Sequence, residues 1–180
     1  MKKLIVLTLL LMLCGCAHWL PAGGPYSPDS KDYSVQLPEK WMRLNIKDSK
    51  YVIMTRDGIR LQSISVETFP VEKALKYTKK KLTKDMLPQE AAEVIIDNAK
   101  TNPVHSNFEI IENVPMTIAG HQGFKVVYSF RSKDGLRSRS VYCGFIHDGF
   151  CYGIVYAAAA RYYFDKDFQT YEKVLASFKL

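Results

Sequence analysis

A series of strand-like segments joined by very short turns fills the second half of the chain, and this feature constrains the fold most. The segments rich in apolar residues are 108–112, 114–119, 124–131, 136–146 and 150–159. Gly120, Lys133-Asp134-Gly135 and His147-Asp148-Gly149 separate the later segments, and these residue types are typical of turns. Turns this short join antiparallel neighbours, because parallel strands need a long crossover. The sequence therefore predicts an antiparallel meander.

Shorter strands are predicted in the first half of the chain. Residues 33–38 alternate apolar and polar side chains, as a half-buried strand does. Residues 51–56 and 59–68 form a predicted hairpin, because Asp57-Gly58 between them supplies the positive φ angles of a tight turn. The alternation changes phase within 59–68, and a bulge near Gln62-Ser63 is the predicted cause. These strands extend the antiparallel sheet.

Two regions have helical patterns. Pro70 suits the first position of a helix, so we expect one or two helices from there to about residue 100. The apolar face of the second part comprises Ala91, Val94, Ile95 and Ala99. A last helix is expected to begin near Asp165, a residue type that caps helix N-termini. This order predicts an α+β fold, a layered sandwich in which helices flank a twisted antiparallel sheet of about six to seven strands.

The N-terminus has the parts of a secretory signal. Two lysines precede an apolar run over 4–13, which is shorter than the ~20 residues of a membrane span. The run ends in Leu13-Cys14-Gly15-Cys16, which resembles the lipobox of bacterial lipoprotein precursors. The resemblance implies that Cys16 is lipidated and becomes the first residue of the mature protein. Cys14 is a weaker candidate, because Leu13 would then occupy the small-residue position; a secreted protein with a chance cysteine is the other alternative.

Three parts follow from this pattern: a signal peptide over 1–15, a lipidated N-terminus with a flexible tether over 16–31, and one α+β globular domain over 32–180. The tether prediction rests on three prolines and two glycines, which disfavour a helix or a central strand. Ala17 follows the cysteine, and in enteric-type lipoproteins, which this pattern resembles, that residue implies the outer membrane, facing the periplasm. No later apolar run is long enough to span a membrane.

Two segments of the domain resemble the ends of PsbP-like/DcrB-like superfamily domains. Residues 33–41, Tyr-Ser-Val-Gln-Leu-Pro-Glu-Lys-Trp, resemble the aromatic-led opening strand, and residues 173–178, Lys-Val-Leu-Ala-Ser-Phe, resemble the closing helix. The superfamily includes photosystem accessory proteins, small exported lipoproteins and a Ran-binding protein. The resemblance implies a twisted antiparallel sheet between helices, and a role in binding or assembly support without a shared catalytic set.

Cys143 and Cys151 flank the predicted turn at 147–149. An oxidising compartment allows a disulfide between them. With a three-residue loop the two thiols share one face of the hairpin but stand diagonally, with Cα atoms ~7–8 Å apart. That separation exceeds the normal limit of ~7 Å, and a small adjustment of the loop would bring the thiols opposite one another. A disulfide and two buried free thiols both remain open.

Four lysines recur at helical spacing in the segment that follows Pro70: Lys73, Lys76, Lys80 and Lys84. One interpretation is a basic stripe against an anionic membrane surface, where each lysine contributes ~1 kcal/mol. The other is an ordinary solvated face of an amphipathic helix. The net charge of +7 falls to +5 once the two lysines of the signal are removed, which is too little for a nucleic-acid partner.

The chain has no nucleophile-elbow, phosphate-loop, zinc-protease or Cys-x-x-Cys motif. We therefore expect a non-catalytic domain with no metal or cofactor, which binds a protein partner at the membrane. The alternative is a carrier of a small apolar ligand or lipid in an aromatic pocket between sheet and helix, lined by Tyr152, Tyr156 and Phe168; core packing also explains these residues. An enzyme would require His105, His121 or His147 to converge on a carboxylate.

Overall fold

Short turns between successive strands produce one large antiparallel sheet. The structure, a computed structural model, describes residues 18–30, 32–46 and 49–180. In spatial order the eight strands are β1 (Trp19–Pro21), β4 (Met42–Leu44), β5 (Tyr51–Thr55), β6 (Gln62–Pro70), β10 (Phe150–Ala159), β9 (Arg137–His147), β8 (His121–Arg131) and β7 (Ser106–Ile118). β2 (Gly24–Tyr26) and β3 (Val35–Leu37) form a separate two-stranded sheet. The antiparallel prediction is confirmed, with more strands than expected.

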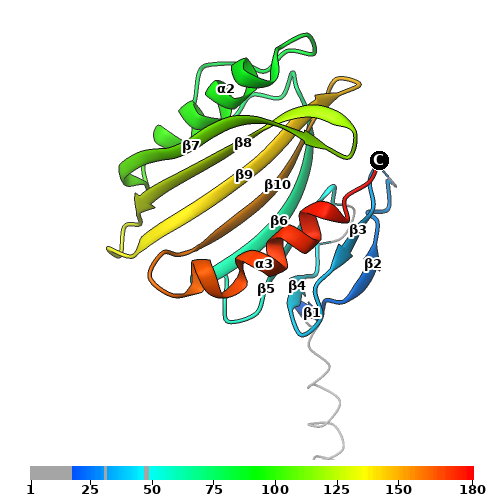
Figure 1. Cartoon of the computed structure of the whole chain (residues 1–180), viewed down its shortest axis with the longest axis vertical. Helices are drawn as coiled ribbons and strands as arrows, with labels where there is room; N and C mark the ends of the chain where they lie inside the picture. The colour runs from blue at the N-terminus through cyan, green and yellow to red at the C-terminus, as the bar shows by residue number, and fades with distance from the viewer. Residues whose placement is uncertain (1–17, 31, 47–48) are drawn as a thin grey trace, which may run out of the picture.

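The two faces of the large sheet are covered by different helices. α3 (Tyr163–Ala176) packs on one face, against β10, β6 and the nearby β3, and α2 (Pro88–Lys100) packs on the other, against β7, β8 and β9 (Figure 1). We call these the α3 face and the α2 face. In β10, Ile154 and Tyr156 lie in the core under α3, whereas Cys151 lies in the core under α2. Burial on both faces explains the nearly continuous apolar run of this strand, and the α+β class is confirmed.

The tether predicted over 16–31 is wrong for the residues that the structure describes. β1 pairs with β4, with Trp19 opposite Leu44, and β2 pairs with β3. The chain between them is also held, since Ala22 is buried and its amide donates to the Trp41 carbonyl at 2.8 Å. Proline needs no amide donor at a sheet edge, so the prolines of this segment are compatible with short edge strands. Cys16 and the segment 1–15 lie outside the described residues.

The helix predicted from Pro70 is also corrected. Pro70 is the last residue of β6, opposite Phe150, and residues 71–87 form turns and irregular chain. The proline at the start of a helix is Pro88, the first residue of α2. The Glu90 carboxylate accepts a hydrogen bond from the Leu87 amide at 2.9 Å, which satisfies a donor at that helix end. Both prolines fit a helix start locally, and packing selects the second.

Three smaller predictions change as well. β6 pairs with β10 in unbroken register from Gln62 onward, so no bulge forms there. The phase break arises because Ile59 and Leu61 belong to the preceding turn. The strands predicted over 108–112 and 114–119 are one strand, β7, with irregular register near its middle. α3 begins two residues before Asp165, without a side-chain cap.

Candidate functional site

The hairpin of β9 and β10 separates the two cysteines. Its turn is only Asp148-Gly149, with φ angles of 47° and 75° that suit a two-residue turn. Cys151 therefore lies opposite Ile146, and Cys143 lies opposite Ile154. Since these pairs are three residues apart along each strand, the thiols point to opposite faces, Cys143 to the α3 face and Cys151 to the α2 face. Both are free and buried, which corresponds to the second of the two alternatives that the sequence left open.

The aromatic pocket predicted between sheet and helix is filled by side chains. Tyr156 is completely buried, and its hydroxyl donates to the carbonyls of Tyr163 and Phe164 at 2.7 and 3.0 Å. Its ring packs against Phe168 of α3, and Tyr152 stacks on another core ring. These residues are core packing, and the carrier hypothesis loses the pocket it required.

A cavity of about 430 Å³ lies on the α2 face, beside α2. Its floor is formed by residues of three central strands: Ser65 and Glu67 of β6, Val155 of β10 and Tyr142 of β9. Its walls come from α2 and from residues 73–77 of the irregular segment. Because α2 packs on β7–β9, the α2 face of β6 and β10 stays partly open.

A buried polar pair forms the base of this cavity. The Tyr142 hydroxyl donates to Glu67 Oε1 at 3.0 Å. Burial raises the pKa of Glu67 above its usual value, while the Tyr142 hydrogen bond and the charge of Lys73 partly oppose that shift. Burial likewise raises the pKa of Tyr142, next to the Cys151 thiol, whose own pKa is raised to about 12. Tyr142 therefore stays a neutral donor, and the thiol is unreactive at neutral pH.

Two glycines create the space that Tyr142 occupies. Gly144 and Gly153 lie directly opposite one another on β9 and β10. A Cβ atom at Gly153 would lie 2.4 Å from the Tyr142 hydroxyl oxygen, and one at Gly144 would lie 2.7 Å from Tyr142 Cε1. Glycine at both positions therefore leaves the space that the Tyr142 side chain occupies where it reaches Glu67.

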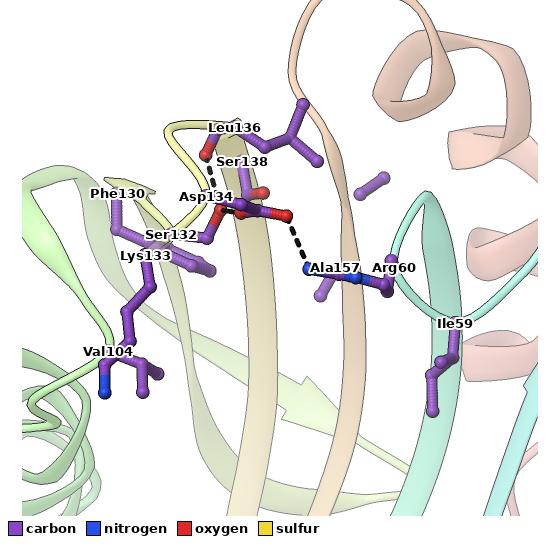
Figure 2. Close-up of a pocket in the computed structure, with 11 residues that line it drawn as sticks. Ile59, Arg60, Val104, Phe130, Ser132, Lys133, Asp134, Leu136, Ser138 and Ala157 are labelled. Atoms are coloured by element: carbon purple, nitrogen blue, oxygen red, sulfur yellow. Dashed lines mark hydrogen bonds and ion pairs between the residues drawn. The ribbon is translucent and has the colours of Figure 1, made fainter.

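A second cavity, of about 560 Å³, opens further along the same face. It lies between the turn that precedes β6 and the turn that joins β8 to β9 (Figure 2). Arg60 of the first turn reaches Asp134 of the second, with Nη2 and Oδ2 2.6 Å apart. The Asp134 carboxylate also accepts a hydrogen bond from the Ser132 hydroxyl, so two partners hold its position. Ala157 of β10 and Phe130 of β8 line its apolar part.

The two cavities follow one another along the central strands. Val155 lines the first and Ala157 the second, and these residues are successive on the α2 face of β10. His105 lines the first cavity and Phe130 lines the second, and the centres of their rings are 3.8 Å apart. Burial lowers the pKa of His105, so this ring is neutral at neutral pH. We call the two cavities together the α2-side groove.

Comparison with known proteins assigns this fold. A family model described as PsbP matches residues 24–180. The chain belongs to the PsbP family. No curated protein matches it. The family match includes residues that were predicted to form the tether, in agreement with their place in β2.

Solved structures resemble this PsbP domain at low sequence identity. Cyanobacterial PsbP from Synechocystis is 14% identical with a TM-score of 0.55, and the match covers 93% of this chain and 95% of that one. The Ran-binding protein Mog1p of Saccharomyces cerevisiae is 10% identical with a TM-score of 0.54, over 88% and 95% of the two chains. A putative regulator from Pseudomonas aeruginosa is 9% identical with a TM-score of 0.55, over 87% and 95%. Identities this low establish the fold alone.

The four lysines predicted to form a helical stripe do not form one, because residues 71–87 of the PsbP domain are not a helix. Lys73 and Lys76 line the α2-side groove. Lys80 lies elsewhere, with its ammonium group 3.8 Å from Asp97 Oδ1, and Lys84 lines a third depression near the start of α2. Two of the four lysines therefore lie at the groove, and the other two lie outside it.

The three histidines of the domain do not meet at one carboxylate. His121 and His147 lie side by side with ring centres 4.3 Å apart, and His147 Nε2 lies 3.3 Å from Asp148 Oδ2 at the exposed hairpin tip. His105 lies on the groove, where its Nδ1 contacts the Ala99 carbonyl at 2.8 Å. Among the described residues, no group of three or more His, Cys, Asp or Glu side chains is arranged to hold a metal ion.

Sequence reasoning did not single out Glu67, Tyr142, Gly144 or Gly153. The two glycines were the available signal, since glycine inside a strand often marks a close approach of another group. Across the described ranges, no helix has the length and apolar content needed to cross a membrane.

Proposed function

We propose that this PsbP-family chain is a cell-envelope lipoprotein, held by lipidated Cys16 in the outer membrane and facing the periplasm. Its domain binds a protein partner or supports an assembly, without catalysis. The observation that carries this proposal is the α2-side groove, an open sheet face within a family domain. The membrane anchor rests on the lipobox residues Leu13-Cys14-Gly15-Cys16.

The groove has the chemistry of a binding surface for an extended acidic segment. Its floor includes small side chains, such as Ser65 and Ala157, that leave room for another chain. Three lysines, Lys73, Lys76 and Lys133, line its walls, while Asp134 is already paired with Arg60. Complementary charge favours an acidic partner and speeds its encounter. The polar walls and the Glu67 carboxyl do not favour an apolar ligand or lipid, so the carrier function is the weaker alternative.

Two matched charge reversals test the groove. Lys73→Glu with Lys76→Glu reverses the cations that line it, and Lys80→Glu with Lys84→Glu makes the same change in the same segment outside it. After in vivo cross-linking and affinity capture, the first pair should lose a defined protein band at least about tenfold, since rim charge pairs control encounter. The second pair should retain it. Loss in both variants or in neither would refute the groove as the binding site, and capture of lipid alone would favour the carrier.

The anchor has its own test. Cys16→Ser removes the only sulfur at the processing site, so labelling of cells with a fatty-acid analogue should mark the wild-type protein and not the variant. The variant should remain as unprocessed precursor in the inner membrane or be released by another peptidase. Label on the variant, together with outer-membrane fractionation, would contradict the lipobox interpretation.

A further inference from the structure

We infer that the sheet edge formed by β1 and β4 is a lipid-facing surface that rests on the bilayer holding the protein. The inference depends on the proposed lipidation of Cys16 and adds an orientation to it. The occupant of this surface is the bilayer itself, because the chain between anchor and sheet is too short for anything else to intervene.

The distance from the anchor to the sheet is fixed by the chain. Cys16 and His18 are two residues apart, so their Cα atoms are separated by at most ~7 Å. From His18 onward the chain is held by β4, since the His18 carbonyl accepts a hydrogen bond from the Asn45 amide at 3.0 Å. Trp19 then pairs with Leu44 in the sheet. A lipid on Cys16 therefore brings this edge to the headgroups.

The same edge exposes an apolar surface. The register of β1 and β4 puts Trp19 beside Leu44 and Pro21 beside Met42, so all four lie on one face of the sheet. Met42 is 37% exposed, and Ile46, just after the strand, is 40% exposed. α2 packs on β7–β9, at the far end of the strand order from β1, and does not cover this part of the sheet (Figure 1). We call Trp19, Pro21, Met42, Leu44 and Ile46 the edge patch.

The composition of the edge patch suits a membrane interface. Tryptophan prefers the headgroup level, where its ring is half in contact with apolar chains and its indole N–H reaches water or headgroups. Exposed methionine and isoleucine side chains gain free energy when lipid replaces water around them. Lys40 is exposed in the turn before β4, and a lysine near anionic lipid is worth ~1 kcal/mol; Arg43 points to the opposite face of β4, where its guanidinium lies over the Tyr26 ring.

The opposite edge of the sheet offers a matched control. Ile110 and Ile111 of β7 are 47% and 50% exposed, compared with 37% and 40% for Met42 and Ile46. They lie at the other end of the strand order from β1. Replacement of either pair by aspartate removes similar exposed apolar surface, and only one pair faces the anchor.

Quenching of tryptophan emission by brominated lipids tests the orientation. The full lipidated protein is purified and reconstituted into vesicles of phosphatidylethanolamine and phosphatidylglycerol, with or without bromine in the acyl chains. The chain has two tryptophans, Trp19 and Trp41, and Trp41 is only 2% exposed. Brominated lipid should lower the emission by roughly a third through Trp19, as expected for an interfacial ring. The Trp19→Phe variant should show little quenching, and Met42→Asp with Ile46→Asp should reduce the quenching at least about twofold relative to Ile110→Asp with Ile111→Asp.

The outcomes separate this inference from the anchor. Vesicle-bound protein with unquenched Trp19, or with equal quenching in both aspartate pairs, would overturn the lipid-facing edge while leaving the lipoprotein intact. Protein that carries no fatty-acid label and does not remain with vesicles would refute the lipidation of Cys16. Folding of each variant is checked by its far-UV circular dichroism before reconstitution.

Discussion

Substitution of Asp167 by alanine should loosen the attachment of α3 to the sheet. The Asp167 side chain is 1% exposed. Its carboxylate forms an ion pair with one residue of the β5–β6 hairpin and accepts a hydrogen bond from another. Arg56 Nη2 lies 2.6 Å from Oδ1, and Gln62 Nε2 donates to Oδ2 at 3.0 Å. Gln62 is itself completely buried, so this contact joins two elements that are far apart in sequence.

The expected cost follows from the exposure of each partner. Removing one member of a fully buried ion pair costs ~3–5 kcal/mol, but Arg56 is 34% exposed and can turn to water, which reduces its share to ~1–2 kcal/mol. Gln62 Nε2 keeps its hydrogen bond to Asp57, so the lost bond costs only ~1 kcal/mol. Asp167→Ala should therefore destabilise the domain by roughly 2–3 kcal/mol, a fall in Tm of roughly 4–12 °C.

Urea unfolding followed by tryptophan emission measures this change, because Trp41 is buried in the core beside α3. Asp165→Ala is the matched control, since it removes the same group from an exposed position of the same helix. Asp167→Asn should lose less than the alanine variant, because an amide oxygen still accepts from Gln62. If Asp167→Ala lowers the free energy of unfolding no more than Asp165→Ala, the bridge between α3 and the hairpin does not stabilise the fold.

Two further predictions concern buried groups. Burial raises the folded-state pKa of Glu67, so the folded chain holds its proton more strongly, and wild-type stability should fall as the pH rises from about 4 through that pKa. Glu67→Gln removes this loss, so its urea midpoint should improve relative to wild type between about pH 4 and about pH 7, and a difference independent of pH would contradict the raised pKa. Cys143 and Cys151 face opposite sides of the sheet, so oxidation of the folded protein should form no bond between them; a mass loss of two hydrogens in the native state would refute the observed register.

The strands were predictable because turn residues and apolar alternation act locally. The segment 150–159 was expected as a strand and is β10. The register was not predictable to one residue, since a two-residue turn at Asp148-Gly149 and a three-residue turn use the same residue types. That single residue decides whether the two thiols share a face, because side chains alternate along a strand.

The helical segment and the candidate site were harder to predict, for a different physical reason. Pro70 and Pro88 both suit a first helical position, and only the pairing of Pro70 with Phe150 excludes it. The lysine spacing after Pro70 then resembled a helix face in a segment that is irregular chain. The Glu67–Tyr142 pair joins residues 75 apart in sequence, and no local pattern reports such a contact.

The orientation inferred from the anchor determines whether Lys73 and Lys76 can reach the membrane. β10 is four strand spacings from β1, so the α2-side groove lies about 19 Å along the sheet from the edge patch. Figure 1 shows α2, at the top of the view, and β1, at the bottom, on opposite sides of the molecule. If β1 rests on the bilayer, Lys73 and Lys76 are too distant to bind the headgroups of the same membrane, since electrostatic attraction decays within ~10 Å. Their charges are then available to the proposed partner on the side away from the bilayer, so the Lys73→Glu with Lys76→Glu variant should lose the captured band and keep its Trp19 quenching.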